Sequence, residues 1–221
     1  MGAYSKLQAV NEMLLFSGET PVNSLTASTG VDTSIAVDIL DQKTLDAQAR
    51  GLANNLTIRD YTIAADGRIN LQNSSTIISA NMLTPVESAH KDVQYARVVT
   101  KNWGSNTVPY FFNLTDNTDV FKAGTYTAEL MLNIDWQEMD TPVQKEIVMQ
   151  AARQYQMLTQ GDGAVDNYIA QLELYYGAKA RGSDVKSKGY NLFDLHQNAH
   201  KATSRNIRHD RSKSRFPNLY K

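Results

Sequence analysis

The chain contains no cysteine among its 221 residues. This absence excludes a disulfide framework, a thiolate metal site, an iron–sulfur cluster and a cysteine nucleophile. Long apolar runs are also missing, because the longest, Val108 to Phe112, has five residues, whereas a membrane-spanning helix needs about 20. The apolar stretch from Met13 to Phe16 is too short for the core of a signal peptide. We therefore expect a soluble protein that is made in a reducing cytoplasm and does not enter a membrane.

The net charge is close to zero, at −1, from 22 Lys and Arg against 23 Asp and Glu. These charges are unevenly distributed along the chain. Residues 183–221 contain nine Lys and Arg but three Asp, a net charge of +6, so the preceding residues carry −7. With 42% hydrophobic residues the body can bury a core, whereas the basic segment is typical of an interaction arm.

Two helices are predicted near the N-terminus. The first has apolar residues at helical spacing, and Gly18 supplies a C-terminal stop. The second is expected to take its cap from residues 32–34 and to end at Gly51. The apolar positions of the two helices are Leu7, Val10, Leu14, Ala36, Leu40 and Ala47.

From about residue 54, short runs rich in Ile, Leu, Thr and Tyr alternate with turn clusters, a pattern typical of β structure. The clearest strand is predicted over residues 126–134, where apolar and polar residues alternate. Residues 95–99 and 108–112 are predicted as further strands, and Pro109 places the latter at a sheet edge. We expect about five to seven antiparallel strands in all.

Helical spacing returns after residue 138. Residues 141–144 are typical of a capping box, with Pro142 at the first helical position. A turn at residues 161–163 then leads to a fourth helix that is predicted to end near Gly182. The apolar positions of these two helices are Val143, Ile147, Ala151, Tyr155 and Leu158, followed by Val165, Ile169, Leu172 and Tyr176.

This order predicts an α+β fold, because strands grouped together without βαβ alternation do not build a parallel sheet. Two N-terminal and two C-terminal helices are expected to form a four-helix core with an inserted antiparallel β domain. The predicted parts are an N-terminal helical part (1–53), the β domain (54–137), a C-terminal helical part (138–182) and an extended basic arm (183–221).

Catalytic signatures are weak in this sequence. His196 and His200 have the i, i+4 spacing of a zinc pair, but no third ligand is evident. Glu129 and Asp135 could form a hydrolase-like carboxylate pair, a pattern of little specificity among 23 acidic residues. Complete nucleophile and phosphate-loop motifs are missing. We therefore expect no catalytic activity, metal or cofactor, with a virion-associated glycan or cell-wall hydrolase as the alternative.

The basic arm combines cations with apolar anchors, so it suits a docking role. Its cations could contact acidic protein surfaces or nucleic acid, since both attract the same residues, and a nucleic-acid-binding module is a second alternative. The candidate docking residues are Tyr190, Phe193, Leu195, Arg205, Arg208, Arg211, Phe216 and Tyr220.

Several stretches resemble a known family in the same order along the chain. They are AVNEML at 9–14, GETPVNSL at 18–25, QARG at 48–51, DGRINL at 66–71, NTDVF at 117–121 and AARQY at 151–155. Together they resemble the tail tubular protein A family, the head-to-tail adaptors of short-tailed bacteriophages. The likeness covers residues 6–180 and is weakest over the basic arm.

The resemblance implies a structural role in the virion tail. Such adaptors form a ring of twelve copies beneath the portal protein, continue its DNA channel, and give a platform for the tail nozzle and tail fibres. It also implies a helical bundle with an inserted β domain, the same order that the residue pattern predicts. DNA is then expected to pass through the ring without specific binding.

Overall fold

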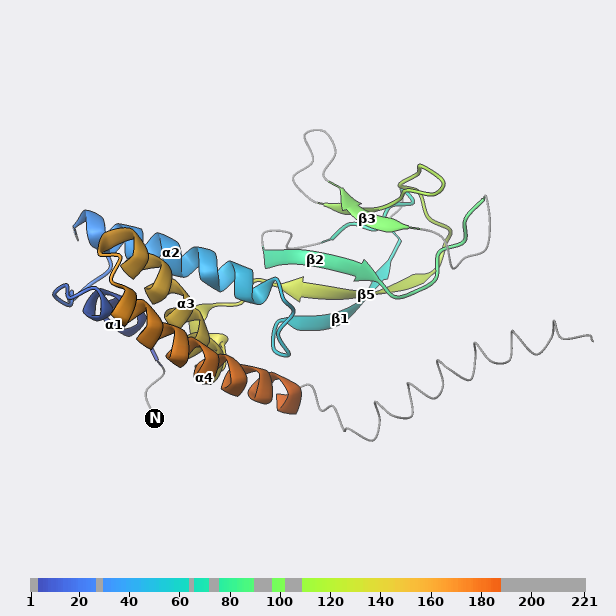
Figure 1. Ribbon diagram of the computed structural model, residues 1–221. Helices are drawn as coiled ribbons and strands as arrows, with labels where there is room; N and C mark the ends of the chain where they lie inside the picture. Colours follow the sequence, from blue (N-terminus) through green and yellow to red (C-terminus); the bar gives the residue numbers. More distant parts are fainter. Residues whose placement is uncertain are drawn as a thin grey trace, which may run out of the picture.

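A bundle of four helices carries a β unit at one end (Figure 1). The computed structural model describes residues 4–26, 30–63, 66–71, 76–89, 97–101 and 109–187. Two helices precede the strands and two follow them, so the predicted order and the α+β class are confirmed. The helices are α1 (Lys6–Phe16), α2 (Val31–Gln48), α3 (Thr141–Thr159) and α4 (Gly163–Ser187).

The ends of α1 follow from local chemistry. Ser5 caps its start, because its Oγ accepts the backbone N–H of Gln8 while the Gln8 side chain accepts the backbone N–H of Ser5. The predicted stop at Gly18 is confirmed. Its φ of +68° lets the backbone N–H of Glu19 donate to the Leu14 carbonyl at 2.9 Å, which satisfies a helix-end acceptor.

The core of the bundle is built around α3, which contacts each of the other three helices. Ile147, Ala151 and Tyr155 on α3 are fully buried, as the periodicity predicts. Met13 of α1 and Leu40 of α2 reach the same core. Each large apolar side chain buried in this way contributes about 1.5–3 kcal/mol.

The β unit contains two antiparallel sheets within the described residues. One sheet has the order β1 (Leu56–Thr62), β5 (Thr125–Leu132), β2 (Ile77–Met82), so β5 is the central strand. The other pairs β3 (Val98–Lys101) with β4 (Tyr110–Asn113). A core separate from that of the bundle lies between them, and its fully buried members are Ile69, Leu71, Phe111, Ala128 and Leu130.

Four helix predictions need correction. The caps of α2 and α3 are Gly30 and Asp140, not the residues predicted, and neither makes a side-chain capping bond. Leu158 is 67% exposed, because it falls in the last turn of α3. The end of α4 predicted near Gly182 is wrong, since the helix continues to Ser187 and the residues beyond Gly182 make contacts that offset the cost of a helical glycine.

The strand predictions are right in kind but displaced along the chain. The strand predicted over residues 126–134 ends at Leu132, because Ile134 packs against the helical core instead. The one predicted over 108–112 runs from Tyr110 to Asn113, and the one predicted over 95–99 is described from Val98 to Lys101. Five strands lie within the described residues, as many as the lower bound predicted, and they form two sheets of the β unit.

Candidate functional site

A buried polar contact joins the bundle to the β unit at the end of α2. The side chain of Gln48 is fully buried, donates to the Ile134 carbonyl at 3.1 Å and accepts the Ile134 N–H at 2.7 Å. The backbone carbonyl of Gln48 accepts the side-chain amide of buried Asn55 at 2.9 Å. One residue therefore ties α2 both to the segment that leaves β5 and to the loop that enters β1.

An ion pair reinforces the same junction. Arg50 donates from its two terminal nitrogens to the carboxylate of Glu146 on α3, at 2.9 and 3.1 Å. Glu146 is 4% exposed, so the bidentate bonds from Arg50 offset the cost of burying its carboxylate. The hydrogen bonds with Glu146 in turn raise the pKa of Arg50 above its ordinary value.

The end of α4 contacts the junction too. Asp184 accepts the backbone N–H of Ala53 at 2.6 Å, and Ser183 donates to the carboxylate of Asp140 at 2.9 Å. A groove of about 220 Å³ lies beside these contacts and is lined in part by Arg50. Because α2, α3 and α4 all hold the connecting segments, the β unit projects from the bundle in a defined direction (Figure 1).

The junction could not be predicted from the sequence, although one of the stretches that resemble the family contains part of it. Gln48 and Arg50 are the two polar side chains of the QARG stretch at 48–51. Polar residues at the end of an amphipathic helix give no signal by themselves, since most such residues face solvent. Their partners Ile134 and Glu146 lie 86 and 96 residues further along the chain.

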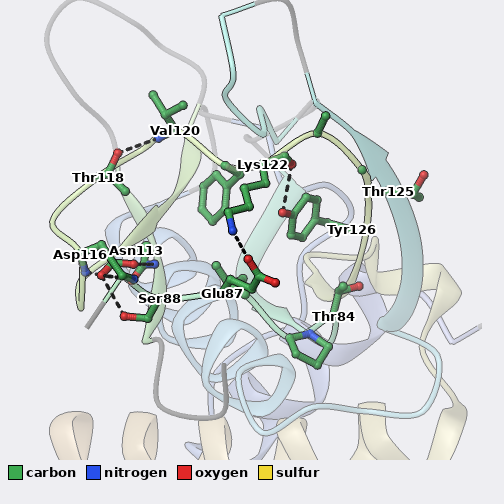
Figure 2. Close-up of a pocket in the computed structure, with 16 residues that line it drawn as sticks. Thr84, Glu87, Ser88, Asn113, Asp116, Thr118, Val120, Lys122, Thr125 and Tyr126 are labelled. Carbon is green, nitrogen blue, oxygen red and sulfur yellow. Dashed lines mark hydrogen bonds and ion pairs between the residues drawn. The ribbon is translucent and has the colours of Figure 1, made fainter. Parts of the chain in front are cut away.

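A second candidate site is a hollow of about 550 Å³ at the end of the β unit farthest from the bundle (Figure 2). Three loop segments line it: the stretch after β2, the turn after β4 and the loop that enters β5. Lys122 and Glu87 form an ion pair across its middle, and Tyr126 donates to the Lys122 carbonyl at 3.1 Å.

Asp116 joins two of these segments on one side of the hollow. One carboxylate oxygen accepts Ser88 Oγ at 2.8 Å and the Ala89 N–H at 2.9 Å, and the other accepts the Asn113 side chain at 2.9 Å. The neighbouring residue Asn117 has a φ of +53°, a left-handed conformation that asparagine tolerates in tight turns. The polar side chains around the hollow therefore bind one another and fix the shape of this end of the β unit, called the tip below.

The candidate hydrolase carboxylates have separate positions. Glu129 lies on β5, opposite Ile58 of β1 and Asn81 of β2. Asp135 caps the short 3₁₀ turn η3 (Trp136–Glu138). Neither residue lines the groove beside Arg50 or the hollow at the tip, so the structure does not bring this pair into either site.

The predicted docking residues lie outside the described residues: Tyr190, Phe193, Leu195, Arg205, Arg208, Arg211, Phe216 and Tyr220. The same holds for His196 and His200, the pair with zinc-like spacing. In the described part of the chain, no group of three or more His, Cys, Asp or Glu residues is placed to hold a metal ion. None of the helices described there has the length and apolar character that a membrane span requires.

The fold is a helical bundle that carries a β unit, and the junction contacts hold the two in a fixed relation. A comparison with protein families matches residues 7–190 to the family described as Tail tubular protein, and the chain belongs to that family. It is accordingly a structural component of the phage virion tail and assembles with other components of that tail. A comparison with curated proteins returned no match.

Proposed function

We propose that this protein is the head-to-tail adaptor of its phage: a ring subunit that sits between the portal protein and the tail nozzle. The ring continues the DNA ejection channel, gives a platform for nozzle and fibres, and has no catalytic activity. The resemblance implies twelve copies. The observation that carries the proposal is the family match, which runs through both halves of the bundle and the inserted β unit.

The junction supports this role, because an adaptor transmits a fixed geometry from one ring to the next. The contacts of Gln48 with Ile134, of Arg50 with Glu146 and of Asp184 with Ala53 hold the β unit from three helices. Repeated around an axis, such subunits place every β unit at the same height. The polar tip of each β unit then offers a contact surface toward a neighbouring tail component.

The charge distribution fits a DNA conduit. Residues 1–182 carry a net charge of −7, so they repel the phosphate backbone and let DNA slide through the ring. The basic arm, with +6 over residues 183–221, is proposed to dock on an acidic surface of the portal. Arg205, Arg208 and Arg211 would speed and orient docking, and Tyr190, Phe193, Leu195, Phe216 and Tyr220 would supply the lasting contacts.

Co-sedimentation with portal particles of the same phage tests the proposal. The purified full-length chain should remain monomeric or weakly associated alone and should attach to the particles as a closed ring. Electron microscopy of the pelleted particles should show added density on the axis below the portal. Failure of the intact chain to attach at any protein concentration would contradict the adaptor role.

The same preparation separates the adaptor from a hydrolase. Peptidoglycan and capsule glycan are incubated with the purified chain and with Glu129→Gln and Asp135→Asn variants. We expect no turnover above buffer for any of them. Turnover that one of these substitutions abolishes would assign the protein to the enzyme class instead.

A further inference from the structure

The outer face of α2 is acidic. Side chains spaced three and four residues apart share one side of a helix, and on α2 this side is opposite the buried Ala36 and Leu40. The one lysine of the helix, Lys43, is half-buried on its flank. The exposed residues of the outer face are Val31, Ile35, Asp38, Gln42, Leu45 and Asp46.

The outer face of α4 has a regular small-and-aromatic pattern. Its exposed residues recur at alternating spacings of three and four, the repeat by which helices pack along a seam. Tyr168 and Tyr175 are more than half exposed, and Leu174 beside them is 72% exposed. The members of this seam are Tyr168, Gln171, Tyr175, Ala178, Gly182 and Val185.

The charges that flank the α4 seam are basic. Lys179, Arg181 and Lys186 are exposed, and the Lys179 ammonium lies over the Tyr175 ring at 4.4 Å. The acidic residues of α4 face inward instead. Asp166 and Glu173 bind Arg153 of α3, and Asp184 binds the Ala53 N–H.

The two outer faces lie on opposite sides of one bundle. α3 packs against both α2 and α4, and Figure 1 shows it between them. Both helices run toward the β unit, since α2 ends at the contact of Gln48 with Ile134 and α4 reaches Ala53 through Asp184. Asp38 and Asp46 on the α2 face therefore lie at about the same distance from the β unit as Lys179 and Lys186 beside the α4 face.

We infer that the outer face of α2 in one copy packs against the outer face of α4 in the next. The inference deepens the proposed ring by naming its subunit contact. Complementary faces on opposite sides of one protomer make a heterologous contact, which repeats until the ring closes. Asp38 and Asp46 would meet Lys179 and Lys186, while Ile35 and Leu45 would cover the exposed tyrosines. A second copy suits both faces at once, since one chain carries the two complementary charges.

Charge reversal with mixing tests the contact. The full-length variant Asp38→Lys/Asp46→Lys makes both faces basic, and Lys179→Glu/Lys186→Glu makes both acidic. Each variant alone should weaken ring formation on portal particles by roughly tenfold or more, through like-charge repulsion. An equimolar mixture should restore the ring, because the two variants can alternate. The matched control Arg59→Glu/Arg97→Glu changes two exposed cations of the β unit and should assemble normally.

A cross-linking experiment gives a second readout that does not depend on charge. Since the chain has no cysteine, Asp46→Cys/Lys186→Cys supplies the only two thiols, and Asp46→Cys/Arg59→Cys is the control. A short bismaleimide should give a covalent ladder with the first variant, both on portal particles and at high concentration in solution. No ladder above the control overturns the contact. Failure of the wild-type chain to bind portal, with the ladder intact, contradicts the adaptor role alone.

Discussion

The side-chain amide of Gln48 makes two hydrogen bonds with the backbone of Ile134, one through each amide atom, across 86 residues of sequence. Ile134 follows the end of β5, and the Gln48 side chain gives its backbone the two hydrogen bonds that a neighbouring strand would otherwise provide. Because Gln48 is fully buried, water cannot replace either bond. The end of the β unit and the end of α2 are therefore fixed to each other.

Replacement of Gln48 by leucine should destabilise the whole fold. The change leaves the N–H and the carbonyl of the half-buried Ile134 without this partner, at a cost of about 2–4 kcal/mol in the free energy of unfolding. Urea denaturation measures the loss. The matched control is Gln42→Leu, on the exposed face of the same helix, which should change stability by less than about 0.5 kcal/mol. Equal effects of the two substitutions would contradict a special role for Gln48.

Tyr155 should make stability fall at high pH. Burial, followed by the hydrogen bond to Glu19, raises its pKa above the ordinary value of 10.0. A raised pKa favours the protonated phenol in the folded state, so its contribution is complete below pH 10 and is lost as the pH rises above it. Tyr155→Phe should cost about 1–2 kcal/mol at pH 8, from the lost bond to Glu19 at 2.8 Å.

The difference between Tyr155→Phe and wild type should shrink as the pH rises above 10. Urea midpoints between pH 8 and 11 record it, and Tyr168→Phe, whose ring is 56% exposed, is the control. A constant difference across this range would show that the Tyr155 hydroxyl does not titrate at higher pH in the folded state.

Gly67 should not tolerate a side chain. Its φ is +79°, and an added Cβ would lie 2.8 Å from Cγ1 of Val120. Gly67→Ala should lower the free energy of unfolding by about 1–3 kcal/mol, from backbone strain plus the close contact. In the double variant Gly67→Ala/Val120→Ala, the part of this loss that comes from the close contact with Val120 should be recovered. At Gly163, the first residue of α4, a Cβ would meet nothing within 4 Å, so alanine should be nearly neutral. Similar losses at the two glycines would contradict a special constraint at Gly67.

Two truncations should separate the proposed docking arm from the bundle. Deletion of residues 188–221 keeps α4 whole, so the unfolding free energy should stay within about 0.5 kcal/mol of wild type while portal attachment is lost. Deletion of 183–221 also removes the contacts of Ser183 and Asp184 and should cost about 2 kcal/mol more. If the variant that lacks residues 188–221 attached to portal with wild-type affinity, the arm would not be the docking element.

Neutralising the arm cations gives a finer test of the same arm. The triple variant Arg205→Gln/Arg208→Gln/Arg211→Gln should attach more weakly than wild type at low salt. The difference should shrink as the salt rises, because the charge attraction that the variant lacks is then screened in the wild type while the apolar anchors remain in both. Co-sedimentation between 50 and 500 mM salt measures this change, with the salt range set to span Debye lengths from about 14 to 4 Å. Attachment that does not depend on these three residues at any salt would place docking elsewhere.

Local chemistry in the sequence determined the parts of this protein and their order. The apolar spacing of α1 and α3, the stop at Gly18 and the alternation in β5 all act over a few residues, so each could be predicted without the fold. The ordered stretches from 9–14 to 151–155 likewise indicated the family that the comparison then showed. These features depend on neighbours in sequence.

Tertiary structure decided how the parts are joined. Gln48, Arg50 and Glu146 are ordinary polar residues until the fold brings partners from about 90 residues away, and no local pattern predicts such a contact. The same long-range contacts end β5 before Ile134 and carry α4 past Gly182, because Asp184 gains a partner at Ala53. Whether an exposed helix face is solvated or available for a neighbouring copy is also decided in three dimensions, since α3 places the acidic face of α2 and the basic face of α4 on opposite sides.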